Sequence, residues 1–365
     1  MKATRCAGIV VLAASPLLAH AVTYSVTDLG VLSGDSFSEA TDVNNLGQVV
    51  GYSLGSTSRA FIWDPINGMQ EIGDLPGGQN ISQASSINDN GFVVGSSSAS
   101  TGTRGFIWDP TNGMVDIGDL EGGVDFSSAH SLNNNNQVAG FSAVDGGNHA
   151  ILWDAANGLT DLGELPGGSV AGYGLSINSH GDVAGYSVAA TGHRAFLWNS
   201  VTGMIDLGDI PGRNDFSQGY GVNDNGFVVG RSSTGNGDHG FIWDATNGMV
   251  DIGDLPGGIE LTIGFAINNS NQVVGQSDTV GGGHAFIWDS TNGMVDLNTL
   301  LDATGSGWTL MSATSINELG QIVGTGQFNG QTRAFLLTPD SVPEPGTMIA
   351  LGIGALALAR KKRKK

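Results

Sequence analysis

The chain has 365 residues, a formal net charge of −20, 59 glycines and one cysteine. This length allows two ordinary domains or one large repeat fold, and 40% apolar residues are enough to build a core, which excludes wholesale disorder. Between residues 22 and 342, six arginines stand against 33 acids, a balance of −27. Such a surface repels nucleic acids and anionic lipid headgroups, and it favours cations or neutral ligands such as glycans.

Residues 1–21 have the pattern of a secretory signal peptide. Lys2 and Arg5 form its basic start, residues 7–18 form its apolar stretch, and the Ala-His-Ala sequence at 19–21 is a small-x-small cleavage site. The alternative is a buried N-terminal helix. The single cysteine, Cys6, lies inside this segment. We therefore expect a mature protein without disulfides, a cysteine metal site or a thiol nucleophile.

The middle of the chain is a 45-residue repeat. It is marked by tryptophans in phrases such as RAFIWD and HAFIWD: Trp63, Trp108, Trp153, Trp198, Trp243 and Trp288. A seventh copy, RAFLL, has Leu337 in the tryptophan position. Such a period indicates a propeller, a helical array or a solenoid. Each period, for example residues 86–120, holds four apolar β-branched and aromatic runs separated by glycine-rich turns and shows no helical periodicity, which excludes helical arrays.

Two turn motifs recur in the repeat. The first, I-N-x-x-G, carries its asparagine at Asn44, Asn88, Asn133, Asn178, Asn223, Asn268 and Asn317. Three residues later only Gly or Asn occurs, which predicts a left-handed backbone, and the leading Asn can hydrogen-bond the turn. The second motif, W-D-x-x-N-G-M, contains Asn-Gly dipeptides that predict tight hairpins. We interpret these asparagines as turn residues rather than as ligands.

Four antiparallel strands in 45 residues form one propeller blade. The last copy ends after its third strand, near Thr338, whereas residues 24–32 (YSVTDLGVL) match the fourth strand of the other copies (NGMVDLGDL). The sequence therefore predicts an all-β fold over residues 22–340: a seven-bladed β-propeller of four-stranded blades closed by the N-terminal strand. Closure of this kind removes an open sheet edge.

With its HAFIWD phrases, the sequence resembles the HAF repeat family, which is described as extracellular repeats. The resemblance covers residues 24–337 and implies no established biochemical activity. The seventh copy departs from the pattern, because it lacks the tryptophan and has four extra residues before its Asn turn. This insertion, LLDATGSGWTL, contains Trp308 out of register with the other tryptophans.

A basic position recurs at the start of each third strand: Arg59, Arg104, His149, Arg194, His239, His284 and Arg333. A ring of these residues could grip an anionic sugar. The favoured interpretation is structural pairing with an acid fifteen residues on, which is present in five copies as Asp74, Asp119, Glu164, Asp209 and Asp254. His284 and Arg333 lack that acid and flank the insertion. His284, Trp308 and Arg333 are therefore the candidate ligand-binding residues.

No motif predicts catalysis. The sequence has no HExxH, GxSxG or Walker motif, and its carboxylates recur in every copy, which suits structure better than a unique acid–base pair. No D-x-D-x-D-G calcium loop is present either. We expect no catalytic residues, no cofactor and no metal.

The C-terminal segment has three parts: Pro343-Glu344-Pro345, an apolar run at 347–359 and a basic block at 360–365. A helix of about 20 Å is shorter than the ~30 Å hydrocarbon core, and the basic block would stay on the cytoplasmic side. This order resembles the PEP-CTERM sorting signal. The resemblance implies transient membrane insertion of the helix and processing by exosortase, a membrane transpeptidase-like enzyme of Gram-negative bacteria that make exopolysaccharide. A plain membrane anchor is the alternative.

Together these features predict a secreted or surface-displayed, non-enzymatic protein with a structural or adhesive role in the cell envelope or exopolysaccharide matrix. Exosortase and exopolysaccharide are the expected partners, and nucleic acid is not. The alternative is a polysaccharide-active propeller enzyme, a glycosidase or lyase. A cluster of non-repeating polar residues on one face would favour that alternative.

Overall fold

The computed structural model describes residues 22–211 and 215–340. The predicted signal peptide and the C-terminal segment lie outside the described residues. The chain divides into two compact units, of which Tyr24–Pro339 holds all the repeats. The other unit consists of the two chain ends and is described only at residues 22, 23 and 340.

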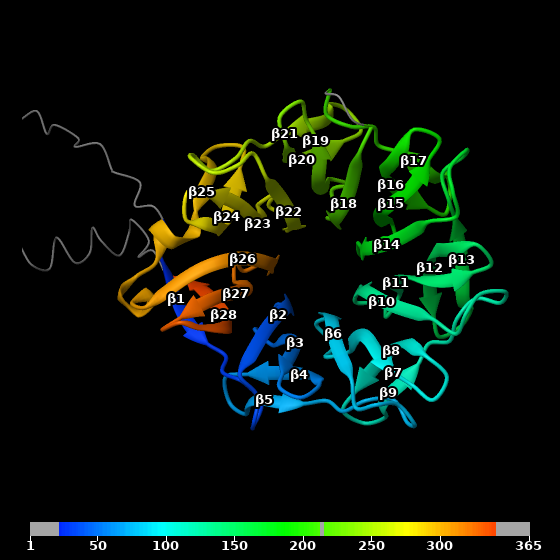
Figure 1. Ribbon diagram of the computed structural model, residues 1–365, viewed down its shortest axis with the longest axis horizontal. Helices are drawn as coiled ribbons and strands as arrows, with labels where there is room; N and C mark the ends of the chain where they lie inside the picture. Colours follow the sequence, from blue (N-terminus) through cyan, green and yellow to red (C-terminus); the bar gives the residue numbers. More distant parts are fainter. Residues whose placement is uncertain (1–21, 212–214, 341–365) are drawn as a thin grey trace, which may run out of the picture. The chain divides into compact units, whose positions relative to one another are not determined.

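The described residues of Tyr24–Pro339 form seven four-stranded antiparallel sheets, arranged as the blades of a ring (Figure 1). This arrangement confirms the predicted all-β seven-bladed propeller. Each repeat supplies four strands because its apolar β-branched runs are interrupted by turns that Gly and Asn can adopt. The innermost strands surround a central channel, and we number the blades one to seven in the order of these strands along the chain, from β2 (Phe37–Val43) in blade one to β26 (Trp308–Ile316) in blade seven.

The innermost strands are β2 (Phe37–Val43), β6 (Ser82–Ile87), β10 (Ser127–Leu132), β14 (Gly172–Ile177), β18 (Ser217–Val222), β22 (Thr262–Ile267) and β26 (Trp308–Ile316). The second strands are β3 (Val49–Leu54), β7 (Val93–Ser98), β11 (Val138–Val144), β15 (Val183–Ala189), β19 (Val228–Ser233), β23 (Val273–Thr279) and β27 (Ile322–Phe328). The third strands are β4 (Ser58–Asp64), β8 (Thr103–Asp109), β12 (Gly147–Asp154), β16 (Gly192–Asn199), β20 (Asp238–Asp244), β24 (Gly282–Asp289) and β28 (Gln331–Pro339). The outermost strands are β5 (Gly68–Glu71), β9 (Gly113–Asp116), β13 (Gly158–Gly163), β17 (Gly203–Asp206), β21 (Gly248–Asp251), β25 (Gly293–Asp296) and β1 (Tyr24–Asp28).

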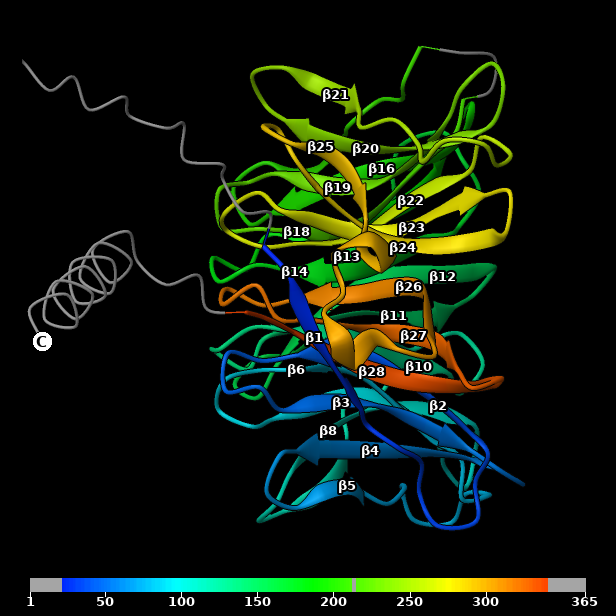
Figure 2. The same ribbon diagram turned by 90° about the vertical axis from the view of Figure 1, so that its left-hand side faces the viewer.

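The ring closes as predicted, because β1 is the outer strand of the last blade. The strand order there is β1-β28-β27-β26, with Tyr24 opposite Pro339 and Asp28 opposite Phe335. The insertion forms two 3-10 turns, η1 (Leu297–Leu300) and η2 (Ala303–Gly305). The Val26 N–H donates to Thr304 Oγ1 at 2.7 Å, so the insertion holds the closing strand in place (Figure 2).

The two ends of the blades form two faces of the ring. The turns from first to second strands, such as residues 44–48, and from third to fourth strands, such as 64–68, make up the turn face. The loops from second to third strands and the connections between blades make up the loop face. Adjacent strands are antiparallel, so these two sets of connections lie at opposite ends of every blade.

The hairpins of the turn face differ from the predicted two-residue Asn-Gly turns. Asp64 pairs with Gly68, so three residues form the loop, and Gly68 closes it at φ 69°. The Asp64 carboxylate accepts hydrogen bonds from the backbone N–H groups of Ile66 and Asn67 and from the Asn67 side chain. The aspartate of the W-D pair therefore organises this turn, which the sequence reasoning had assigned to Asn-Gly alone.

Each innermost strand contains a β-bulge. In β2 the register shifts between Ala40 and Asp42, and the glycine of the V-V-G sequence in β3 lies opposite. A Cβ on Gly51 would lie 2.0 Å from the Glu39 carbonyl oxygen, so only glycine fits beside the bulge. The extra residue of the bulge, Thr41 in β2, lines the central channel.

Seven apolar clusters fill the gaps between neighbouring blades. Their largest fully buried side chains come from the F-I-W phrase: Phe61, Phe106, Phe196, Phe241, Phe286, Phe335 and, in the third blade, Ile151. Burying one such side chain stabilises the fold by about 1.5–3 kcal/mol. Each repeat therefore contributes one large buried side chain to the core from the same position of its sequence.

Candidate functional site

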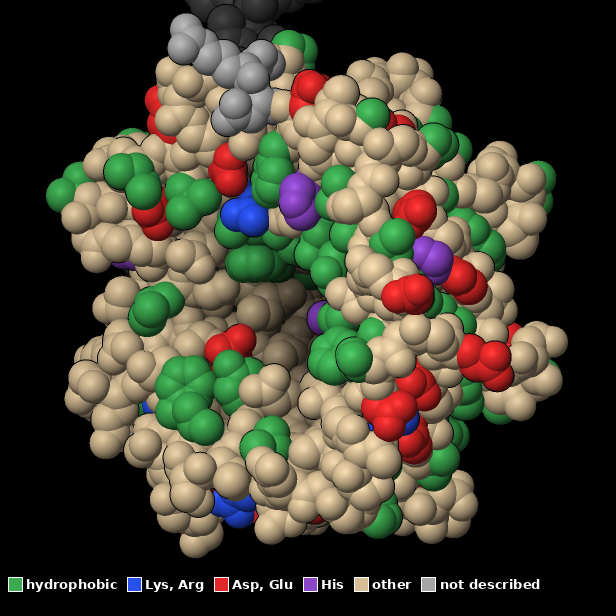
Figure 3. All heavy atoms as spheres, turned by 45° about the vertical axis from the view of Figure 1, so that its right-hand side comes forward, with side chains coloured by type: hydrophobic (Ala, Val, Ile, Leu, Met, Phe, Trp, Pro, Cys, Tyr) green, Lys and Arg blue, Asp and Glu red, His purple; other side chains and the backbone are tan. Residues whose placement is uncertain are grey.

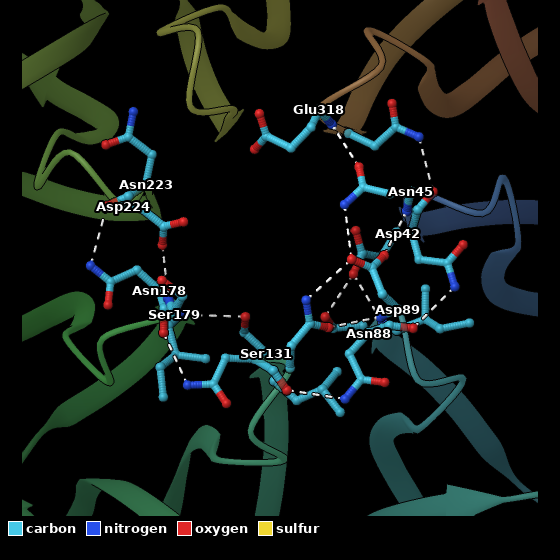
Figure 4. A pocket seen from close by; sticks show the side chains of 18 of the residues that line it. Asp42, Asn45, Asn88, Asp89, Ser131, Asn178, Ser179, Asn223, Asp224 and Glu318 are labelled. Carbon is cyan, nitrogen blue, oxygen red and sulfur yellow. Dashed lines mark hydrogen bonds between the residues drawn. The ribbon is translucent and has the colours of Figure 1, made fainter.

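The channel mouth on the turn face is built by the predicted turn asparagines. In the first turn, Asn44 Oδ1 accepts from the N–H groups of Leu46 and Gln48, which confirms the turn role. Its Nδ2 also donates to the carbonyl oxygen of Asn88 in the next blade at 3.0 Å. The same donor–acceptor link joins every pair of neighbouring blades and returns from Asn317 to the Asn44 carbonyl. Figure 4 shows part of this ring.

The residues after these asparagines form a second, outer ring of polar side chains at the mouth: Asn45, Asp89, Asn134, Ser179, Asp224, Asn269 and Glu318. Asp89 Oδ1 accepts the Asn45 N–H at 2.8 Å, and Asp224 Oδ1 accepts the Ser179 N–H at 2.8 Å. Burial opposes ionisation of Asp89, but hydrogen bonds from Asn45 and Asn134 outweigh it, and its pKa is lowered. The mouth is therefore anionic, and its acids Asp89 and Asp224 hydrogen-bond to the neighbouring blades.

Below the mouth the channel continues into a cavity of about 190 Å³ lined by the seven bulges. Here the repeat breaks down, and we call this level the belt. Its bulge residues are Thr41, Ser85, His130, Leu175, Tyr220, Phe265 and Thr314. The belt is thus apolar and aromatic over blades four to six and hydroxyl-bearing over blades seven, one and two. Burial lowers the pKa of His130 to about 4, so its imidazole is neutral at pH 7.

Asp42 is the single acid among seven equivalent belt positions, the others being Ser86, Ser131, Ser176, Gly221, Ala266 and Ser315. Its carboxylate accepts from the Ser86 and Ser315 hydroxyls, each at 2.6 Å, and from two backbone N–H groups. Burial raises its pKa, although these hydrogen bonds act against the rise. Asp42 therefore ties the first blade to both of its neighbours.

At the loop-face end, the aromatic side chains concentrate on blades three to five. The rings of Phe141 and Tyr173 are 4.7 Å apart and T-shaped, and Tyr173 stacks on Tyr186 at 4.7 Å. The series continues through His193 to Phe216, over which the Arg231 guanidinium lies at 5.2 Å. We call these six side chains the aromatic arc. Each is partly exposed.

A groove adjoins the aromatic arc on blade three. Its volume is about 650 Å³, and Phe126, Val144 and Asn148 are among its lining residues. The Asn148 side chain donates to the Tyr173 hydroxyl at 3.0 Å, so groove and arc are continuous. Sequence reasoning missed the arc because its members lie outside the repeated phrases. The signal that could have revealed the arc is the position equivalent to Tyr186, which is aromatic in some copies of the repeat and not in others.

The recurrent Arg/His position is paired with acids, as the favoured interpretation predicted. Ion pairs join Arg104 to Asp119 and, at 2.7 Å, Arg194 to Asp209, and a hydrogen bond of 3.1 Å joins His149 to Glu164. Two predicted pairs are wrong: Arg59 pairs with Asp35 and Glu71 rather than Asp74, and His239 with Asp251 and Glu260 rather than Asp254. The partner that was missed lies twelve residues on, where the fourth strand runs directly beside the third.

The three candidate ligand residues each have a structural partner. His284 Nδ1 lies 2.7 Å from Asp296, Trp308 stacks on Phe328 with centroids 4.9 Å apart, and Arg333 donates to the Ser36 carbonyl at 2.9 Å. Among the described residues, no hydrogen bond or ion pair joins His284, Trp308 and Arg333 to one another. Their role in ligand binding stays a prediction.

Across residues 22–211 and 215–340, no group of three His, Cys, Asp or Glu side chains is placed to hold a metal ion. Within the same residues, no helix has the length and apolar character needed to cross a membrane. Figure 3 shows acidic side chains scattered over the blades around the hollow centre of one face.

Two family models match the chain. The PEP-CTERM protein-sorting motif matches residues 341–364, which include Pro343, Glu344 and Pro345. A family described as a protein of unknown function, DUF3466, matches residues 169–340. Fold and tail together define a surface-sorted seven-bladed β-propeller. The chain carries a PEP-CTERM signal for processing by exosortase, a membrane enzyme, and this signal directs export and cell-surface sorting in Gram-negative bacteria.

The comparison with curated proteins found no match. Among solved structures, the chain is similar to a gluconolactonase from Xanthomonas campestris, with 10% identity over 87% of this chain and 90% of that one and a TM-score of 0.43. TolB from Acinetobacter baumannii is 12% identical over 88% of this chain and 64% of that one, with a TM-score of 0.39. The Dos1 propeller is 11% identical over 86% of this chain and 95% of that one, with a TM-score of 0.45. At these identities and TM-scores, the likeness carries no argument about activity.

Proposed function

We propose that this protein is a non-enzymatic, surface-displayed adhesin that binds neutral polysaccharide, such as the exopolysaccharide of the cells that produce it. The proposal includes cleavage of residues 1–21 as a signal peptide and membership of the HAF-repeat type. The aromatic arc is the observation that carries it. Sugars present apolar C–H faces that pack on aromatic rings, and their hydroxyls hydrogen-bond to polar edges.

The arc has the features that such a ligand needs. Tyr173, Tyr186 and Phe216 offer partly exposed rings on one face, and Asn148 and Arg231 supply polar groups beside them. The adjoining groove of about 650 Å³ gives an extended chain a place to lie. The excess of acids over the propeller disfavours anionic polysaccharides, so a neutral one fits best.

In the belt and in the blade-three groove, the disposition of carboxylates supports binding without catalysis. Glycoside hydrolysis needs two carboxyl groups facing one bond, about 5–9.5 Å apart. Asp42 is the one carboxylate among the residues lining the belt cavity, and four hydrogen bonds already occupy its two oxygens. Along the blade-three groove, the one acid among the lining residues is Asp145.

The test is co-sedimentation of the full chain, purified in nonionic detergent, with a neutral and an acidic exopolysaccharide. We expect saturable binding to the neutral polymer and none to the acidic one. A Tyr173→Leu/Tyr186→Leu variant keeps apolar bulk between the blades and removes the ring faces, so its dissociation constant should rise about tenfold. Trp308→Leu is the matched control at the insertion and should bind normally.

Each part of the proposal has an outcome that contradicts it. Normal binding by the double tyrosine variant, with loss in Trp308→Leu, would move the site to the insertion. Release of new sugar ends during incubation with polymer would contradict the non-enzymatic role. Absence of binding to either polymer would remove the adhesin proposal and leave a surface protein with another partner.

A further inference from the structure

The belt is a second place where the repeat is broken. It adjoins the aromatic arc, because His130 stacks on Phe141 at 5.3 Å and Gln218 accepts from both Tyr220 and Arg231. Its cavity of about 190 Å³ has room for about six water molecules. It shares Asp42, Ser86 and Ser131 with the cavity of about 270 Å³ at the turn-face mouth. The two cavities are therefore consecutive parts of one channel, open to solutes from the turn face.

One side of the belt offers aromatic surface to the channel. Tyr220 and Phe265 lie on adjacent blades with ring centroids 5.9 Å apart at 60°, and Leu175 precedes them on blade four. Burial raises the pKa of Tyr220, and its hydroxyl donates to Gln218, so it remains a neutral ring. Blades one, two and seven carry Thr41, Ser85 and Thr314 at this position. Three neighbouring apolar side chains lining a polar cavity indicate a ligand with an apolar part.

The other side carries the one acid of the belt. Asp42 lies on blade one, three blades around the ring from Tyr220, between the hydroxyls of Ser86 and Ser315. The residues lining the belt and mouth cavities include no Lys or Arg. At the mouth, Asp89, Asp224 and Glu318 add negative charge along the path inward. Acids lining a narrow opening focus the field and attract cations.

We propose that the belt binds a small organic cation, an ammonium group bearing apolar substituents. The charge faces Asp42, and the substituents pack against Tyr220 and Phe265, whose electron-rich faces attract a desolvated cation. A hydrated metal ion would gain nothing from the aromatic side, and a neutral apolar molecule would gain nothing from Asp42. The proposed cation site and the proposed polysaccharide site use different residues.

Tetramethylammonium is the probe, added to the full chain in nonionic detergent at constant ionic strength and followed by calorimetry. Tert-butyl alcohol, a neutral molecule of similar shape, tests the need for charge, and potassium tests the need for apolar substituents. We expect saturable binding of tetramethylammonium and at least tenfold weaker binding of the other two. Equal binding of tert-butyl alcohol, or no saturable binding of tetramethylammonium, overturns the proposal.

Two variants test the two sides of the belt. Asp42→Ser introduces the residue that four other blades carry at this position, so the fold tolerates it, and Phe265→Leu keeps apolar volume without the ring. Each substitution should raise the dissociation constant for tetramethylammonium about tenfold. Glu121→Ser, at an exposed acid on the loop face, is the control and should bind normally. If Asp42→Ser and Phe265→Leu both bind like the unaltered protein, the belt is not the site.

Discussion

The asparagine ring at the turn-face mouth is best tested by Asn178→Ala. The Asn178 side chain is 4% exposed. Its Oδ1 accepts the N–H groups of His180 at 3.0 Å and Asp182 at 2.9 Å. Its Nδ2 donates to the Asp182 carboxylate at 3.0 Å and to the Asn223 carbonyl of the next blade at 3.2 Å. Alanine removes all four hydrogen bonds.

The expected cost follows from these partners. A hydrogen bond contributes about 0.5–1.5 kcal/mol net, and buried groups left without a partner cost more. The Asn223 carbonyl keeps a second donor, the Gly226 N–H, and water can enter from the channel. The free energy of unfolding should therefore fall by about 2–4 kcal/mol. The melting temperature should fall by roughly 4–8 °C.

Urea unfolding of the full chain measures this cost. Asn157→Ala, in an exposed hairpin turn, is the control and should cost less than about 1 kcal/mol. Asn317→Ala should cost as much as Asn178→Ala, because its Nδ2 donates across the junction to Asn44 at 2.9 Å. Equal, small losses at Asn178 and Asn157 would refute the ring as a stabilising element.

Three further predictions concern closure, core and acid stability. Val26→Asp puts a charge into the buried face of β1, so limited proteolysis should cut residues 24–32; a protease-resistant variant would contradict the role of β1 in closing the ring. Phe196→Ala removes a fully buried ring and should cost about 3–5 kcal/mol by urea unfolding, and a loss below 1 kcal/mol would contradict the packing. Hydrogen bonds from the hairpin asparagines Asn67, Asn112, Asn157 and Asn247 lower the pKa of Asp64, Asp109, Asp154 and Asp244, respectively. A lowered carboxylate pKa gives stability that is present above the unfolded value, about 3.9, and lost as pH falls through the folded value. The pKa of buried His130, lowered to about 4, gives stability that is lost as pH falls from about 6.5 to about 4, because the unfolded chain takes up a proton that the folded one does not. The urea midpoint should therefore begin to fall below about pH 6.5 and continue to fall below about 4. Asp42, whose pKa burial raises, acts in the opposite sense as a single group, and a midpoint rising below pH 4 would show that it dominates.

The blades and their closure could be predicted because the same local chemistry is written seven times. The left-handed position of the first turn admits only Gly or Asn, and Asn136 and Asn271 adopt φ 58° there. The match of residues 24–32 to the fourth strand located β1, although the strand itself ends at Asp28. Repetition also exposed the Arg/His position, but its acid partner was placed by sequence offset rather than by strand register.

The channel and the arc could not be predicted in the same way. Their residues vary between copies, so they carry no periodic signal, and the bulge decides which of them face the axis. Alternation counted from Ala40 would not place both Thr41 and Asp42 at the channel, yet the bulge places them there together. The link from Asn44 to the next blade needs the ring closed in three dimensions before its acceptor can be identified.

The closing strand also decides how the ring carries load. The sorting motif follows β28, so a pull from a C-terminal attachment enters the ring at Pro339. β28 is not an edge strand, because β27 pairs along one side of it and β1 along the other. A pull along the strand would stress both hydrogen-bonded ladders together in shear, whereas an edge strand can be peeled away one bond at a time. A blade closed by its N-terminal strand therefore resists a pull on its C-terminal end better than an open blade would.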